Sequence, residues 1–270
     1  MKIKISFEIL FFIGFLFGSL NYAKFPSTAQ ENLELNKMEN YLKTARIVTV
    51  EKSTVGGRTA PWIISLDDGK TRLRAIFKHV NRRRPSILPD SYNYELAGYE
   101  LGKLLDLDFV PPVVEREING LNGSLQILVE NTMTENYRER RNIEPPDQKT
   151  FENALEEIKV FENLVYDECL DRDDILIQKS DWKVWRVDFS EAFSPTLELI
   201  PGCEIKRCPK KLYNNLQKLD EKVIESRLKS YLNDEEIRTI VKRKNLIIEK
   251  IKKLIEEKGE EAVLFSFTSS

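Results

Sequence analysis

Hydrophobic and polar residues alternate in the first half of the chain, which predicts a small, mainly antiparallel sheet. Asp67, Asp68 and Gly69 are typical of a hairpin turn between two of the strands. Gly56 and Gly57 mark an earlier turn. The expected strands cover residues 45–51, 62–66, 73–78 and 123–130, with a further extended run at 108–115.

Helical spacing of apolar residues appears once in the first half and dominates the second half. Residues 94–105 predict one helix inserted into the sheet region. Asp147 is a candidate N-cap for a long helix whose apolar face would be formed by Phe151, Leu155, Ile158, Phe161 and Val165. Two short strands, 174–177 and 182–187, are expected to follow.

Three amphipathic stretches run from residue 211 to the end of the chain. The last is predicted to begin at Asn233, with Glu236 placed as in a capping box, and to end near Gly259. The order of elements predicts an α+β fold with two lobes. A small β-rich N-terminal lobe with one helix would cover residues 45–133, and a mainly helical C-terminal lobe would cover residues 134–265.

The N-terminus suggests export. Lys2 and Lys4 precede a short apolar run at residues 9–20, and Ala23 follows it. This arrangement is typical of a secretory signal peptide, although Asn21 makes the cleavage site imperfect. We expect residues 1–23 to be a signal peptide or, alternatively, an uncleaved membrane anchor. Residues 24–44 are then expected to be a linker, with the folded domain outside the cytoplasm.

Charge and cysteine content narrow the function classes. The formal net charge of −2 provides no general attraction to nucleic acid. Of the three cysteines, Cys203 and Cys208 are close in sequence and could be bonded in an oxidising compartment, leaving Cys169 free. His79 is the only histidine, which disfavours His-based zinc sites and serine or cysteine catalysis that needs a histidine. Any chemistry therefore depends on carboxylates and lysine.

Candidate chemical groups stand at the ends of predicted elements. Lys78 ends the third expected strand, Glu95 lies in the first turn of the next helix, and Asp188 follows the last short strand. An acidic cluster, which includes Asp171 and Asp174, lies between the long helix and a strand. Phosphoryl transfer from a nucleotide needs a lysine, a glutamate that fixes it, metal-binding carboxylates and a base, and these residue types occur here in that order.

Six segments of the sequence carry recognisable motifs: residues 74–78, 92–105, 110–116, 123–126, 161–166 and 182–193. Together they resemble the protein-kinase-like superfamily, nearest the phosphatidylinositol lipid kinases, the HipA-type kinases and the secretory Fam20-like kinases. The resemblance covers nearly all of the chain after residue 44 and predicts a two-lobed kinase-like fold.

The resemblance implies a role for each matching residue. Lys78 would contact the nucleotide phosphates, Glu95 would pair with it, and Gly56 and Gly57 would lie over the phosphates. Gln126 would begin the hinge that contacts adenine and extends to Glu130. Asp174 and Asp188 would hold Mg²⁺, since hard carboxylate oxygens suit this ion. They are expected side by side, because residues 179–182 predict a hairpin; the alternative is that one of them pairs with Arg172 or Arg186.

The catalytic loop departs from the family pattern Asp-Arg-Asn-x-x-Asn. Counted back from Asp174 at the final position, Cys169 stands where the catalytic aspartate belongs, and the Asp171-Arg172 pair comes two residues late. Either Asp171 serves as the base or the base is absent.

Two functions therefore remain open. We expect an exported phosphotransferase that depends on ATP and Mg²⁺, with a protein, lipid or small molecule as acceptor. The alternative is a catalytically impaired pseudokinase that binds nucleotide or acts as a scaffold.

Overall fold

The structure is a computed structural model that describes residues 29–52, 60–83 and 89–267. The expected signal peptide or anchor, Gly56 and Gly57 lie outside the described residues. The elements of the N-terminal lobe are α1 (Ala29–Thr44), β1 (Arg46–Lys52), β2 (Trp62–Asp67), β3 (Arg72–Lys78), β4 (Asn81–Arg82), β5 (Asp90–Ser91), α2 (Tyr92–Leu104), β6 (Val113–Ile118) and β7 (Leu121–Ile127).

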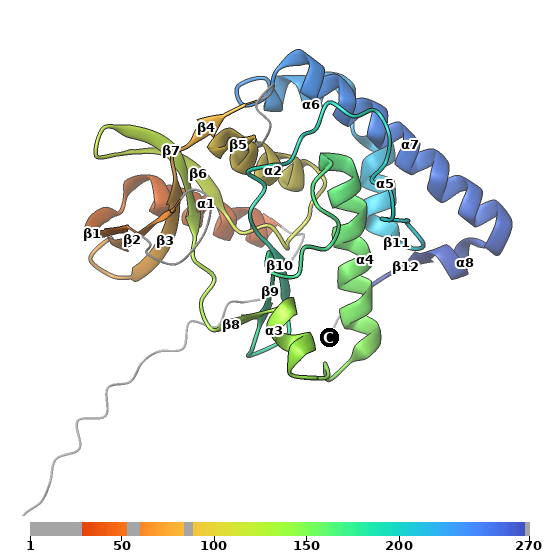
Figure 1. Cartoon of the computed structure of the whole chain (residues 1–270), viewed down its shortest axis with the longest axis horizontal. Coiled ribbons are helices and arrows are strands. Elements are labelled where there is room, and N and C mark those ends of the chain that lie inside the picture. Colours follow the sequence, from red (N-terminus) through yellow and green to blue (C-terminus); the bar gives the residue numbers. More distant parts are fainter. Residues whose placement is uncertain (1–28, 53–59, 84–88, 268–270) are drawn as a thin grey trace, which may run out of the picture.

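The C-terminal lobe is mainly helical and carries a small second sheet, as Figure 1 shows. Its elements are β8 (Thr132–Thr134), α3 (Glu135–Arg140), α4 (Gln148–Val165), β9 (Ile175–Gln178), β10 (Val184–Arg186), β11 (Cys208–Pro209), α5 (Lys210–Lys218), α6 (Glu221–Leu228), α7 (Asp234–Lys258), α8 (Glu260–Val263) and β12 (Leu264–Phe265). The expected α+β fold, with a β-rich N-terminal lobe and a helical C-terminal lobe, is confirmed.

The N-terminal sheet has five strands in the order β1-β2-β3-β7-β6, and neighbouring strands are antiparallel. The predicted turn between β2 and β3 is present, where Gly69 has a φ of +88°, a conformation that favours glycine. Asp67 stabilises this turn by accepting a hydrogen bond from the Gly69 N–H at 2.8 Å. The sheet therefore forms as the alternation of apolar residues predicts.

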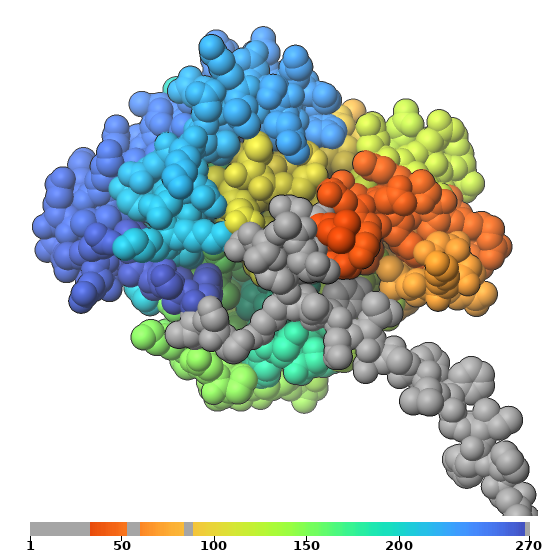
Figure 2. Space-filling model, turned by 180° about the vertical axis from the view of Figure 1, so that it is seen from behind, coloured from red at the N-terminus to blue at the C-terminus, as the bar shows by residue number. Residues whose placement is uncertain are grey.

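Residues 29–44 form helix α1, so the prediction of a linker is wrong for this segment. Leu42 is fully buried against the sheet, and the Tyr41 hydroxyl donates to the carbonyl oxygens of Leu66 and Thr71 at 2.9 and 3.0 Å. Lys103 of α2 pairs with Glu39 at 2.8 Å. Seen from behind, α1 lies on the surface of the N-terminal lobe beside α2 (Figure 2).

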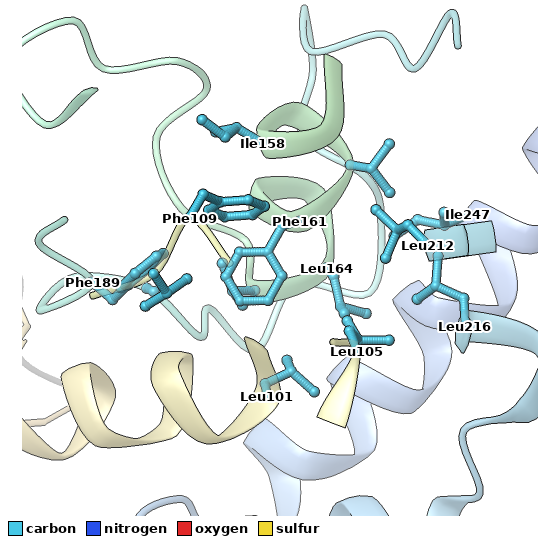
Figure 3. Packing of buried hydrophobic residues seen from close by; sticks show 14 of the residues in the cluster. Leu101, Leu105, Phe109, Ile158, Phe161, Leu164, Phe189, Leu212, Leu216 and Ile247 are labelled. Atoms are coloured by element: carbon cyan, nitrogen blue, oxygen red, sulfur yellow. The ribbon is translucent and has the colours of Figure 1, made fainter. Parts of the chain in front are cut away.

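The larger hydrophobic core joins α2 to the C-terminal lobe. Figure 3 shows Leu101 and Leu105 at the end of α2 facing Phe161 and Leu164 of α4. A smaller core lies between α1 and the five-stranded sheet. Since α2 packs in the larger core, the helix that carries Glu95 is held against the C-terminal lobe.

The predicted helix caps of the C-terminal lobe are confirmed. Asp147 caps α4 by accepting from the Thr150 N–H at 3.1 Å. Asn233 and Glu236 form the expected capping box of α7, and Gly259 ends this helix. None of the helices within the described ranges is long and apolar enough to span a lipid bilayer.

Candidate functional site

Lys78 at the end of β3 is held between two carboxylates. Its Nζ atom lies 2.5 Å from Glu95 Oε1 and 2.7 Å from Asp188 Oδ1. The predicted ion pair between the strand lysine and the helix glutamate is therefore present. We call Lys78, Glu95 and Asp188 the Lys78 cluster; it joins the N-terminal sheet, α2 and the segment after β10.

Local structure fixes Glu95. The Ser91 side chain caps α2, which places Glu95 in the first turn of the helix. The second carboxylate oxygen, Oε2, accepts a hydrogen bond from the Phe189 N–H at 3.1 Å. Gly98 leaves room for Phe189, because a Cβ atom at this position would lie 3.0 Å from the phenyl ring. A side chain at this position would require Phe189 to shift, so glycine suits the close approach of the helix and this segment.

Asp188 lies in a tight local turn with a φ of 63°. Its Oδ1 atom accepts hydrogen bonds from the hydroxyl of Ser190 at 2.7 Å and from its N–H at 3.3 Å. The Asp188 side chain is 41% exposed, whereas the Glu95 side chain is 3% exposed. Glu95 is thus a fixed internal partner of the lysine, and Asp188 can accept a further ligand from solvent.

At two members of the Lys78 cluster, interactions with nearby charges shift the pKa more than burial does. Burial lowers the pKa of Lys78, but the charges of Glu95 and Asp188 hold it above its usual value. Burial raises the pKa of Asp188, but the Lys78 charge and the Ser190 hydrogen bonds hold it below its usual value. Burial prevails at Glu95 and raises its pKa to about 6. Lys78 and Asp188 are therefore both charged near neutral pH.

The predicted hairpin between β9 and β10 is present and brings Asp174 and Asp188 to the same end of it. The Val187 N–H donates to the Asp174 carbonyl at 3.0 Å across the hairpin. The two carboxylates, however, have different cations: Asp188 pairs with Lys78, while Asp174 Oδ2 lies 3.5 Å from Arg186 Nη1. The sequence left open that one of these aspartates pairs with Arg172 or Arg186, and Asp174 does pair with Arg186.

Arg186 forms a second cluster that the sequence did not reveal. Its Nε atom lies 2.9 Å from Glu162 Oε1, and its Nη2 atom lies 2.9 Å from Asp167 Oδ2. We call Arg186, Glu162, Asp167 and Asp174 the Arg186 cluster. Burial raises the pKa of Glu162 to about 7 and of Asp174 to about 8, against the opposing charge of Arg186. The guanidinium is the cation that these three carboxylates share.

A signal for Glu162 was present in the sequence. Glu162 falls four residues after Ile158, on the apolar face of α4, and its side chain is fully buried. A carboxylate on a buried face needs a cationic or hydrogen-bonding partner. The sequence therefore indicated that a partner exists but not that Arg186 provides it.

Asp171, the candidate base, lies in the loop between α4 and β9 and is partly exposed. Its Oδ1 atom accepts from the Asp173 N–H at 2.9 Å, and its carbonyl accepts from the Asp174 N–H at 3.2 Å. Its charge contributes to the raised pKa of Asp174. Asp171 is therefore held in a turn of the loop, near Asp174 of the Arg186 cluster.

Gln126 lies on the Lys78 face of the sheet. It pairs with Ile76 of β3, two residues before Lys78, and residues two apart on a strand share a face. The Gln126 side chain is buried, and its Nε2 atom has no hydrogen-bond partner among the described residues. A buried amide donor without an acceptor is costly, so this position is suited to a ligand with an acceptor atom.

The disulfide prediction is wrong. Cys169 is bonded to Cys203, with Cα atoms 5.8 Å apart, and Cys208 is a free buried thiol. The bond ties the catalytic-loop segment to the chain 34 residues further on. Cys169, at the expected position of the catalytic aspartate, therefore has no free thiol.

One group of three potential metal ligands occurs within residues 29–52, 60–83 and 89–267: Glu162, Cys169 and Cys203. Both sulfur atoms are in the disulfide, and Glu162 binds Arg186 and accepts from the Leu170 N–H at 2.8 Å. These atoms are already engaged, so this group does not fit a metal. Asp188 fits better, because a partly exposed carboxylate offers the hard oxygen ligands that Mg²⁺ and Mn²⁺ bind.

Comparison with known proteins identifies the fold. No family model matches the chain, and no curated protein matches it in sequence. Among solved structures, Fam20 from hydra, solved with sugar, has a TM-score of 0.68 at 16% identity, over 90% of this chain and 95% of that one. The Golgi casein kinase with Mn and ADP bound has a TM-score of 0.62 at 13% identity, over 88% of this chain and 81% of that one.

A second structure of the Golgi casein kinase gives the same TM-score of 0.62, at 12% identity, over 90% of this chain and 80% of that one. These matches cover 88–90% of this chain and so include both of its lobes. The chain therefore has a protein-kinase-like fold.

Proposed function

We propose that the protein is a kinase-like phosphotransferase that takes the γ-phosphoryl group from ATP with the help of a divalent ion. The observation that carries the proposal is Lys78, charged and fixed between buried Glu95 and partly exposed Asp188. A lysine fixed by a glutamate next to a metal-binding aspartate is the arrangement that nucleotide phosphoryl transfer requires. The kinase neighbours support it, one of which was solved with Mn and ADP bound.

Each residue has a proposed task. Lys78 binds the nucleotide phosphates, and Glu95 keeps the lysine in place. Gln126 donates its unpaired amide hydrogen to an acceptor nitrogen of adenine. Asp188 would hold Mg²⁺ or Mn²⁺, with Asp174 beside it, and the ion would neutralise phosphate charge. The glycines Gly56 and Gly57 are proposed to cover the phosphates.

In the transfer step, a hydroxyl oxygen of the acceptor forms a bond to the γ-phosphorus. The bond from this phosphorus to the bridging oxygen breaks, and ADP leaves with the electron pair. Asp171 is proposed to take the hydroxyl proton. The acceptor is a protein, a lipid or a small molecule that carries a hydroxyl group.

A pseudokinase is the second candidate, and one observation favours it. Cys169 stands where the sequence pattern places the catalytic aspartate, and it is locked in a disulfide. Loss of a general base typically lowers the rate 10²–10⁴-fold, while charge neutralisation by lysine and metal is retained. Nucleotide binding without turnover would thus follow if Asp171 does not serve as the base.

Nucleotide binding is tested by titrating the protein with ATP and Mg²⁺ in a calorimeter. We expect saturable binding that is lost in Lys78→Met and Asp188→Ala and retained in Lys70→Met, whose lysine lies in the exposed turn after β2. If Asp188→Ala binds ATP with Mg²⁺ as tightly as the wild type does, nucleotide binding at this site is not part of the protein's function. Transfer of labelled γ-phosphate to an acceptor then distinguishes the phosphotransferase from the pseudokinase. For the phosphotransferase, we expect Asp171→Asn to lose transfer and to retain ATP binding.

We also propose that the domain works outside the cytoplasm. The apolar N-terminal segment resembles an export signal, and a disulfide persists mainly in oxidising compartments. N-terminal sequencing of the protein from its host is expected to find a first residue near Lys24. Recovery from the cytoplasm with Met1 intact would contradict export.

A further inference from the structure

The guanidinium of Arg186 lies among three carboxylates. It approaches Glu162 at 2.9 Å, Asp167 at 2.9 Å and Asp174 at 3.5 Å, each through a different nitrogen. The Arg186 side chain is 1% exposed. The three carboxylates come from α4, from the loop after it and from the residue before β9, so one cation joins α4 to both ends of this loop.

Backbone groups complete the surroundings of the guanidinium. Arg186 Nη1 also donates to the carbonyl oxygens of Val187 and Asp188, the latter at 3.2 Å. Five oxygen atoms thus face one buried planar cation. Oxygen atoms of carboxylates and carbonyls are also the ligands of a divalent ion, so the guanidinium occupies surroundings of the kind that a metal would need.

A second divalent ion at Asp174 would meet two obstacles. The Oδ2 atom of Asp174 already faces Arg186, and a dication at contact distance would be repelled by the guanidinium. The arginine cannot escape this repulsion by losing a proton, because its pKa is far above neutral. In protein kinases two Mg²⁺ ions are held by the aspartate that follows the last strand of the site and by a residue of the catalytic loop.

We propose that Arg186 takes the place of one of these two ions, so that the protein binds its nucleotide with a single divalent ion at Asp188. This inference rests on the proposed function, since it concerns the metal that accompanies the nucleotide. Arg186 is a positioning residue, because it touches neither nucleotide nor metal. Its guanidinium occupies the acidic surroundings of Asp174 and orders the loop that carries Asp171 and Asp174.

The number of ions can be counted directly. The full-length protein, in excess over a non-hydrolysable ATP analogue, is titrated with Mn²⁺, and bound Mn²⁺ is measured by electron paramagnetic resonance. We expect one ion for each bound analogue in the wild-type protein. Two ions in the wild type would overturn the inference and leave the proposed function intact. Absence of any bound analogue would instead overturn the proposed function, and with it the inference.

Two variants test whether Arg186 determines the number of bound ions. Arg186→Lys retains a positive charge and is expected to keep one ion for each analogue. Arg186→Gln removes the charge and leaves the carboxylates, so a second Mn²⁺ is expected to bind. If Arg186 has only a structural role, folded Arg186→Gln will still bind one Mn²⁺ for each analogue. That result would contradict the proposal that Arg186 takes the place of a metal ion. If Arg186→Gln fails to fold, the wild-type count still decides.

Discussion

The Lys78 cluster and the Arg186 cluster are both built from one cation and several carboxylates, yet they differ in access to solvent. The Asp188 side chain is 41% exposed, whereas the side chains of Arg186, Glu162 and Asp167 are 1%, 0% and 7% exposed. Phosphates and a metal can therefore reach the first cluster but not the centre of the second. Similar charges serve binding where the exposed partner contacts the lysine directly. They serve architecture where the cation and its two nearest carboxylates, those of Glu162 and Asp167, are enclosed.

The largest expected effect comes from Arg186→Met. This substitution leaves Glu162 and Asp167 buried without their cation, and breaking a buried ion pair from one side costs about 3–5 kcal/mol. Urea denaturation should show this loss in the free energy of unfolding. Arg172→Met is the matched control, because Arg172 is 62% exposed in its pair with Glu139 and should contribute less than about 1 kcal/mol. Equal losses in both variants would mean that the Arg186 cluster is not structural.

The next effect concerns the disulfide beside the Arg186 cluster. The double variant Cys169→Ser, Cys203→Ser releases a link across 34 residues, and loss of such a link costs about 2–4 kcal/mol. Denaturation without reductant measures it, and the wild type with reductant should match the double variant. A wild type that is indifferent to reductant would contradict a structural role for this bond.

Lys78→Met is expected to destabilise the fold less than Arg186→Met. Glu95 loses its buried partner but can become protonated, since burial already raises its pKa to about 6, while Asp188 remains in contact with water. We expect a loss of about 1–3 kcal/mol at pH 7, less at pH 5. A larger loss than in Arg186→Met would reverse the comparison of the two clusters.

The smallest effect is a pH dependence carried by Asp174. Its folded-state pKa is raised to about 8 from 3.8, so the folded state holds a proton that the unfolded state releases. This contribution to stability is complete below pH 3.8 and is lost as the pH rises to about 8. Between pH 7 and pH 8, the free energy of unfolding should fall by about 1 kcal/mol more in the wild type than in Asp174→Asn. Asp173→Asn, at an exposed neighbour, should behave as the wild type does.

The sequence predicted those parts of the fold and site that depend on local pattern. Alternation predicted the strands of the N-terminal sheet, capping residues predicted the starts of α4 and α7, and the order of Lys78, Glu95 and Asp188 predicted the first cluster. Helix α1 was missed because few of its residues face the sheet, so its apolar stripe is weak; Leu42 and Tyr41 do most of the packing.

Two contacts between distant residues, the disulfide and the Arg186 cluster, could not be predicted from the sequence. Cys203 has Cys208 close in sequence, but the fold brings Cys169 to it from 34 residues away. Arg186 contacts Glu162 and Asp167 because the hairpin of β9 and β10 packs on the end of α4. The spacing of charged residues along a chain does not encode which of several carboxylates a given arginine will meet.

Cys208 gives the protein an internal reporter of unfolding. The chain has three cysteines and two are bonded, so Cys208 is the only thiol. Its side chain is fully buried where β11 pairs with β12, and burial raises its pKa and so suppresses the reactive thiolate. A thiol reagent can label this residue only when the C-terminal strand opens. The labelling rate of the unmodified protein therefore measures how often that part of the molecule opens.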